Sequence, residues 1–233
     1  MTAAEAIPPF DGFADREGRF FRQLARNQRR EWFAAHRDEY EEGWRGPMQA
    51  LLAEVRERID GFYPRHPLAP AKVFRIHRDV RFSKNKSPYK THIGGYVAIE
   101  GGGRAPDTPA AVYFHVGADE VVVAAGHYMM DAAQLARFRA AVVDDARGSE
   151  LAAIVRRLAR AGFAVGSREA LQRVPRGVDP EHPRAELLKR KGLIVTFPAV
   201  PRRLLVKHAL ADWLVPHAKR AAPLVQWLAS VDE

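Results

Sequence analysis

The first third of the chain carries apolar residues at the spacing of helices. They recur every three or four positions, at Phe20, Phe21, Leu24, Trp32 and Phe33. Such a stripe is typical of a helix with one buried face, and Asn27 and Gln28 indicate a turn between two runs. A third helix is predicted from Pro47, because proline is tolerated in a first turn, to a break at 61–64. Its apolar face comprises Met48, Leu51, Leu52, Val55 and Ile59.

The middle of the chain has the composition of strands. Segments rich in β-branched and aromatic side chains lie at 73–76, 92–100, 110–117 and 120–128. Residues 100–109 are mostly glycine, proline and polar residues, which predicts a loop. Ala118 and Asp119 separate the last two segments, which therefore predict a β-hairpin.

Helical patterns return in the second half. Asp131 is a suitable N-cap for a helix to about Ala146, and Ser149 for another that ends before Gly162. A short helix at 183–191 and a strand at 193–197 follow. The last helical stretch starts near Arg203, and Pro216 and Pro223 are expected to break it into pieces.

The order of these elements predicts the fold class. Helices come first, strands follow together, and helices return, which favours an α+β fold over alternating βαβ units. We expect a mostly antiparallel sheet packed against the N- and C-terminal helices. No repeat or long polar linker divides the sequence, so we expect a single domain over 1–233.

The composition indicates the size of the core and the cellular environment of the protein. The 233 residues are 47% hydrophobic, which suffices for one sizeable core. Cysteine is absent, which argues against disulfides and zinc–thiolate sites. The N-terminus has no basic start followed by an apolar run, and no stretch has the length of a membrane span. We expect a cytoplasmic protein with no membrane partner; its oligomeric state is left open.

The charge is concentrated in two segments. The formal net charge is +9, from 37 basic and 28 acidic residues. Segments 72–92 and 184–207 each contain seven basic residues and one acid, so the remainder is slightly acidic. Two basic islands in such a chain indicate local binding sites. The alternative is that each island is a solvated surface.

The first island suggests a site for an anion. If residues 73–82 are extended, Arg75, His77, Asp79 and Arg81 share one face. Arg78 then lies among apolar neighbours, namely Phe74, Ile76, Val80 and Phe82. An arginine there needs a partner, because an unpaired buried charge is costly, and a bound phosphate or carboxylate would provide one.

A lysine-rich loop at 83–90 follows this segment. Its candidate ligand-binding residues are Lys86, Tyr89 and Lys90, beside the clamp of Arg75, Arg78 and Arg81. His77 and Asp79 are candidates for moving protons, because a nearby carboxylate orients an imidazole and raises its pKa. The alternative for the arginines and lysines is a salt-bridge lattice with the acid-rich stretch Asp38, Glu39, Glu41 and Glu42. The alternative for His77 is a position facing solvent.

The same segment resembles a known family. The run Arg75-x-x-Arg78-Asp79-x-Arg81-Phe82, followed by Asn85-Lys86-x-x-Tyr89, is similar to the signature of the bacterial family called domain of unknown function 2461. Three further elements are similar to that family: 27–33 with His36 and Tyr40, Pro175-Arg176-Gly177, and Leu187-Leu188-Lys189. The resemblance implies membership over the whole chain, as one domain. It implies no activity.

Other motifs are weak or missing. Ser83 and Lys86 fit the S-x-x-K pattern of penicillin-recognising enzymes, but no S-D-N motif accompanies them. No Walker loop, G-x-G-x-x-G, H-E-x-x-H or EF-hand loop is present. His77 with Asp79, or His115 with His127, lacks a complete set of metal ligands. We therefore expect neither a metal nor a cofactor.

Two functions remain open, beside a purely structural or partner-binding role. In the first, the protein binds an anionic small molecule, as an enzyme or a binding protein, and Arg176 and Lys189 reach the same anion as Arg78. The alternative for those two residues is an amphipathic surface helix. In the second function, both basic islands form one stripe that binds nucleic acid. A concave arginine pocket would favour the first function, and a convex basic ridge the second.

Overall fold

The computed structural model describes residues 7–81, 84–100 and 110–231. Phe82, Ser83 and the predicted loop beyond Glu100 lie outside these residues. Within them, six strands form one antiparallel sheet of order β1-β2-β3-β4-β6-β5. The strands are β1 Lys72–Val73, β2 His92–Ala98, β3 Ala111–Gly117, β4 Val121–His127, β5 Ala164–Gly166 and β6 Leu193–Thr196.

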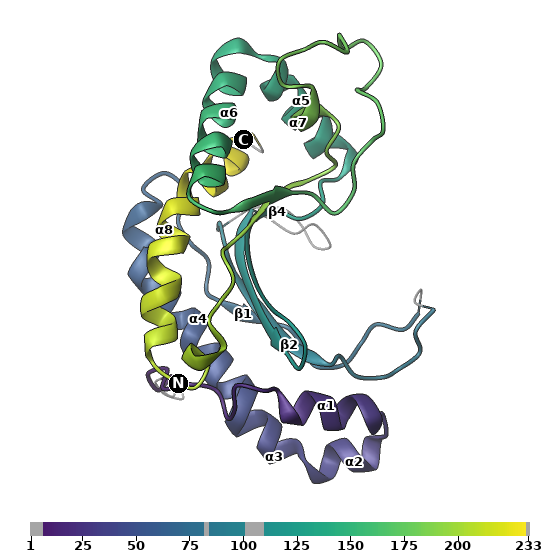
Figure 1. Ribbon diagram of the computed structural model, residues 1–233, viewed down its shortest axis with the longest axis vertical. Helices are drawn as coiled ribbons and strands as arrows, with labels where there is room; N and C mark the ends of the chain where they lie inside the picture. The colour runs from purple at the N-terminus through teal and green to yellow at the C-terminus, as the bar shows by residue number, and fades with distance from the viewer. Residues whose placement is uncertain (1–6, 82–83, 101–109, 232–233) are drawn as a thin grey trace, which may run out of the picture.

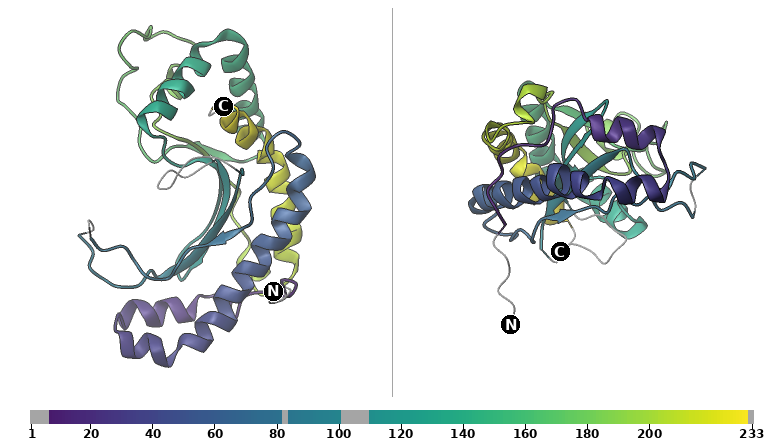
Figure 2. Two further views of the ribbon diagram at one scale, coloured as in Figure 1. Left: turned by 180° about the vertical axis from the view of Figure 1, so that it is seen from behind. Right: turned by 90° about the horizontal axis from the view of Figure 1, so that it is seen from below.

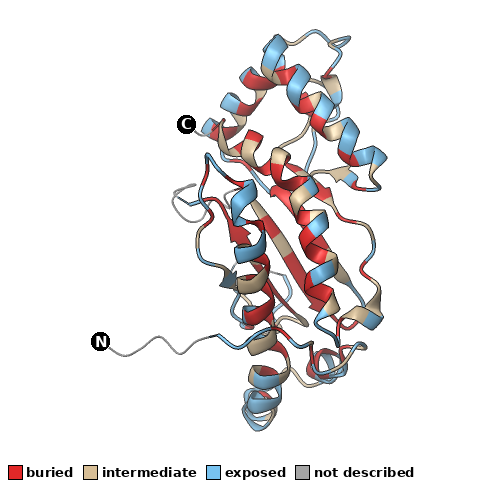
Figure 3. Ribbon diagram, turned by 90° about the vertical axis from the view of Figure 1, so that its left-hand side faces the viewer, coloured by how far each residue is buried: buried red, intermediate tan, exposed pale blue. Residues whose placement is uncertain are grey.

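The sheet is curved, and helices cover its convex face. The helices α4 (Gly46–Ile59) and α8 (Ala209–Ala229) lie side by side along that face, as Figure 1 shows. Figure 3 looks onto this layer, where both helices turn buried residues inward and exposed residues outward. Alternate strand residues such as Ile93, Phe114 and Val195 contribute to the core beneath. The predicted α+β fold, with an antiparallel sheet packed against N- and C-terminal helices, is confirmed.

The N-terminal helices form a lobe at one end of the sheet (Figure 1). They are α1 (Arg19–Arg26), α2 (Arg30–Ala35) and α3 (Arg37–Tyr40), and a π-helical turn at Glu41–Arg45 leads into α4. Asn27 and Gln28 lie in the break between α1 and α2, as predicted. The aromatic stripe is core: Phe21 contacts Trp44 with ring centroids 4.8 Å apart, and both are fully buried.

The helices α5 (Ala132–Val143), α6 (Asp145–Arg160) and α7 (Ala185–Leu188) form a second lobe at the opposite end (Figures 1 and 2). Asp131 caps α5 in a capping box with Gln134, as predicted. The predicted N-cap Ser149 is wrong, because Asp144 accepts from the Arg147 N–H and starts α6 earlier. Strand β5 was not predicted, since three residues are too few to show a period.

The predicted breaks at Pro216 and Pro223 are also wrong. Helix α8 runs for 21 residues through both prolines. Each proline removes one backbone hydrogen bond, but neither is fully buried, whereas residues such as Leu210, Leu214 and Leu228 pack into the core. Burial of this face therefore outweighs the missing bonds. None of the described helices is long and apolar enough to cross a membrane.

Candidate functional site

The first basic segment projects from the end of the sheet as an arm. This basic arm, residues 74–81 and 84–91, is paired irregularly: a bridge joins His77 to Tyr89, and the Arg78 N–H donates to the Pro88 carbonyl at 2.8 Å. Its register differs by two residues from the β1–β2 pairing of Val73 with Gly95. The extra residues bend the arm away from the sheet, as a bulge does, so it extends over the open side (Figure 1).

Side chains of the arm largely follow the predicted alternation. Arg75, His77, Asp79 and Arg81 are exposed, whereas Ile76 is buried and Arg78 is half-buried. Phe74 departs from the pattern, because 38% of it is exposed. The Arg78 Nη2 lies 3.5 Å from the Tyr89 carbonyl oxygen, and its buried Nε has no hydrogen-bond partner in the described part of the chain.

Asp79 is joined to Arg81 rather than to His77. The Arg81 Nε and Nη2 donate to the two carboxylate oxygens at 3.1 and 2.7 Å. These bonds lower the pKa of Asp79 to about 2. His77 instead lies beside Tyr89, with ring centroids 5.2 Å apart. The structure therefore does not bring the proposed proton-moving pair together.

The residues of the lysine-rich loop fold back on the arm. The Lys86 Nζ donates to the Val80 carbonyl at 2.9 Å, and the Lys90 Nζ donates to the Arg75 carbonyl at 3.0 Å. Tyr89 is buried and stacks on Phe33 of α2 at 4.6 Å between ring centroids. Tyr89 thus anchors the arm to the N-terminal lobe. Within the described ranges, Arg75, Arg78, Lys84, Lys86 and Lys90 of the arm form no salt bridge with the acid-rich stretch, and Arg81 pairs with Asp79.

The second basic segment is dispersed, and much of it has internal partners. The buried Arg184 donates to the Val142 carbonyl at 2.7 Å and the Val143 carbonyl at 3.0 Å. Lys189 pairs with Glu186, and Arg176 is exposed on a loop. Both belong to the lobe of α5–α7, whereas the basic arm lies beside α1–α3 (Figures 1 and 2). The structure thus does not bring Arg176 and Lys189 to Arg78.

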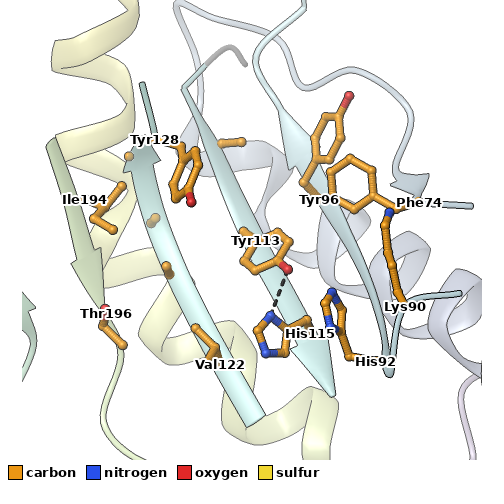
Figure 4. A pocket seen from close by; sticks show the side chains of 14 residues that line it. Phe74, Lys90, His92, Tyr96, Tyr113, His115, Val122, Tyr128, Ile194 and Thr196 are labelled. Carbon is orange, nitrogen blue, oxygen red and sulfur yellow. Dashed lines mark hydrogen bonds between the residues drawn. The ribbon is translucent and has the colours of Figure 1, made fainter. Parts of the chain in front are cut away.

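A cavity of about 600 Å³ lies on the concave face of the sheet, between the two lobes. Figure 4 shows aromatic, histidine and lysine side chains projecting into it from neighbouring strands and from the start of the arm. They include Phe74, Lys90, His92, Tyr96, Tyr113, His115 and Tyr128. Most of its other lining residues are small or aliphatic, such as Ala124 and Ile194. The cavity therefore offers an apolar floor with a few polar groups.

A glycine opens the polar end of this cavity. Gly94 lies opposite His115 in the β2–β3 register. A Cβ at position 94 would lie 2.9 Å from the His115 Cβ and 3.0 Å from the Tyr113 hydroxyl. The missing side chain leaves room for His92 to stack on His115, with ring centroids 4.7 Å apart. Glycine is thus required here by close packing rather than by backbone conformation.

The polar groups at this end form a connected set. The Tyr113 hydroxyl and the His115 Nδ1 are 2.8 Å apart (Figure 4). On the other side of the ring, the His115 Nε2 lies 3.2 Å from the Glu120 Oε1. This second contact is close but is not aligned as a hydrogen bond. Burial lowers the pKa of His115, and the Glu120 carboxylate partly offsets this effect.

Burial and neighbouring charges also shift the pKa values of the other titratable groups in the cavity. Burial, with smaller effects of His115 and Lys90, lowers the pKa of His92 to about 4. Burial raises the pKa of Tyr113 to about 12. Burial lowers the pKa of Lys90, and the positive charges of Arg75 and Arg78 lower it further. At neutral pH the site therefore presents neutral imidazoles, a protonated phenol and a group of crowded cations.

Comparison with known proteins supports the resemblance seen in the sequence. The model of the family described as conserved hypothetical protein (DUF2461) matches residues 18–227. The chain belongs to this family. Searches of curated proteins and of solved structures returned no match.

In this DUF2461 protein, the run of residues that carries the resemblance forms the basic arm. The cavity beside the arm was missed from the sequence, although its signal was present. His92 and Tyr96, like Tyr113 and His115, alternate with apolar residues along strands that were correctly predicted. By the same alternation, His115 and His127 lie on opposite faces of the sheet, since His115 pairs with Val122.

Proposed function

We propose that this protein binds a small molecule with an apolar body and an acidic group on the concave face of the sheet. One observation carries the proposal: Lys90 lines the aromatic cavity, the charges of Arg75 and Arg78 lie near enough to lower its pKa, and within the described residues none of the three forms a salt bridge with a carboxylate. This refines the anion-binding function expected from the sequence.

The cavity suits the apolar part of such a ligand. Its volume of about 600 Å³ is in the range of small-molecule sites, which are largely apolar with few polar groups. Tyr96, Tyr113 and Tyr128 offer ring surfaces for contact. Most of the favourable free energy would therefore come from removing apolar surface of the ligand from water.

The crowded cations suit the acidic part. Repulsion from Arg75 and Arg78 disfavours the charged form of Lys90. A carboxylate or phosphate beside them would convert this repulsion into attraction.

The test is thermal denaturation with a panel of aromatic and aliphatic carboxylates and phosphates. A ligand at one hundred times its dissociation constant adds about 2.7 kcal/mol to the free energy of unfolding. We expect Lys90→Met and Arg78→Met to weaken binding at least tenfold. Lys84→Met is the matched control, because Lys84 is exposed on the same arm and does not line the cavity. Equal affinity of all four proteins, or no stabilising acid, would contradict the proposal.

Single-stranded nucleic acid is the second candidate. The observation that favours it is an antiparallel sheet face bearing Phe74, Tyr96 and Tyr113 beside the basic arm, since aromatic side chains and cations together bind bases and phosphates. Short DNA and RNA belong in the same panel at low and high salt. Stabilisation by oligonucleotides alone that disappears with salt would favour this candidate.

A further inference from the structure

We propose that Glu120, His115 and Tyr113 form a proton relay, and that the ligand of the concave face is a substrate from which this relay removes a proton. The inference rests on the proposed function and adds chemistry to it. It is carried by the contacts of 2.8 Å between the Tyr113 hydroxyl and the His115 Nδ1, and of 3.2 Å between the His115 Nε2 and Glu120.

The order of groups defines the direction of proton transfer. Tyr113 is protonated at neutral pH, so its hydroxyl donates to the unprotonated Nδ1 of neutral His115. The ring proton is then on Nε2, on the side of the Glu120 carboxylate. A carboxylate there stabilises the imidazolium that forms when Nδ1 accepts a second proton.

The relay connects two different environments. Tyr113 and His115 line the apolar cavity on the concave face. Glu120 lines a second cavity of about 720 Å³ next to α1, together with Arg22, Arg26 and Asp119. The ligand would lie at one end of this set of groups and the Glu120 carboxylate at the other, where its charge stabilises the imidazolium.

The proposed step is a balanced proton transfer. The substrate C–H bond breaks and its proton forms a new O–H bond on Tyr113, while the original Tyr113 proton moves to the His115 Nδ1. The electron pair of the C–H bond stays on the substrate as an enolate-like anion. Lys90 in the cavity lining, with the nearby charges of Arg75 and Arg78, would stabilise its negative charge. No other reactant is needed.

His92 stacks on His115 but does not take up the proton that the relay removes. With a pKa of about 4, it stays neutral at pH 7. The charges that face it are those of Lys90, Arg78 and Glu120, and the two cations disfavour its protonation. Of the stacked pair, His115 is the proton acceptor, because its Nδ1 contacts the Tyr113 hydroxyl. The substrate class is an apolar acid with an acidic C–H beside a carbonyl or carboxylate group.

The first test needs no ligand. Nitrogen-15 NMR of the histidine rings should show neutral His115 with its proton on Nε2, and Glu120→Gln should lower the pKa of His115. A proton on Nδ1 in the wild-type protein would overturn the relay, because Nδ1 could not then accept from Tyr113. An unchanged His115 pKa in Glu120→Gln would show that Glu120 is not part of the relay.

The second test measures the chemistry with phenylpyruvate, an apolar acid with acidic CH₂ protons. In D₂O the wild-type protein should accelerate deuteration of the CH₂ group above the uncatalysed rate, and Tyr113→Phe should reduce that acceleration at least tenfold. Tyr63→Phe is the matched control, since it removes a tyrosine hydroxyl from a residue that lines neither described cavity. Binding of phenylpyruvate without accelerated exchange would overturn the relay and leave the binding function standing. If no acid binds, the proposed function fails and the relay, which needs that substrate, fails with it.

Discussion

At the scale of single residues, the site depends on side chains whose neighbours change their chemistry. His92, His115 and Tyr113 are ordinary residues in the sequence, and their altered pKa values arise from burial beside one another. Gly94 contributes by leaving space for the stacked imidazoles. The sequence shows these residue types but not the desolvation that alters them.

His92 gives a prediction about pH. Its pKa is lowered from 6.5 to about 4, so between these values the unfolded chain binds a proton that the folded protein does not. Its contribution to stability is therefore present above pH 6.5 and is lost as the pH falls towards 4. After allowance for solvent screening, we expect this loss to be about 1–2 kcal/mol. Urea unfolding of the wild type and of His92→Asn from pH 4 to 7 measures it, and parallel pH profiles would contradict it.

At the scale of elements, periodicity located most helices and strands correctly. Local sequence was enough to predict the hairpin around Ala118 and Asp119, the N-cap Asp131 and the helix end at Gly162. Each of these features depends on residues a few positions apart. The prolines of α8 were misread. Local propensity favours a break there, but packing of α8 on α4 and the sheet opposes it.

Helix α8 gives a prediction about stability. Pro216 is exposed, so Pro216→Ala removes little packing and restores an N–H that can donate to the Asp212 carbonyl. We expect the free energy of unfolding to rise by about 1–2 kcal/mol, after the greater entropy of the unfolded chain is subtracted. Arg220→Ala, at another exposed position of α8, should change it by less than about 0.5 kcal/mol. A lower midpoint of thermal unfolding for Pro216→Ala would show that the proline is favourable in its setting.

At the scale of the whole molecule, contacts between distant segments decide which charges are free for function. Arg184 was counted with the second basic island, yet its guanidinium joins residues about forty positions earlier, at the corner between α5 and α6. Gly148 provides the space, because a Cβ there would meet the Val142 carbonyl and the Arg184 Nε. This arginine is structural rather than part of a binding surface.

The contacts of Arg184 give a third prediction about stability. Arg184→Ala would leave the buried carbonyl of Val142 and the partly buried carbonyl of Val143 without the donor that Arg184 supplies. We expect a loss of about 2–4 kcal/mol in the free energy of unfolding. The exposed Arg203→Ala is the control with the same change of charge, and it should stay within about 0.5 kcal/mol of the wild type. Similar stabilities of the two variants in chemical denaturation would contradict this structural role.

The sequence by itself determined the α+β class, the position of most elements, the family resemblance and the unusual charge of the basic arm. These properties follow from short-range periodicity, capping and composition, which operate within a few residues. Only the tertiary structure decided that Tyr89 is an anchor on Phe33, that Arg184 is enclosed, and that His92, Tyr113 and His115 line a cavity. The physical reason is that periodicity shows which face of an element is apolar, whereas burial, pKa and ion pairing depend on which distant segment covers that face.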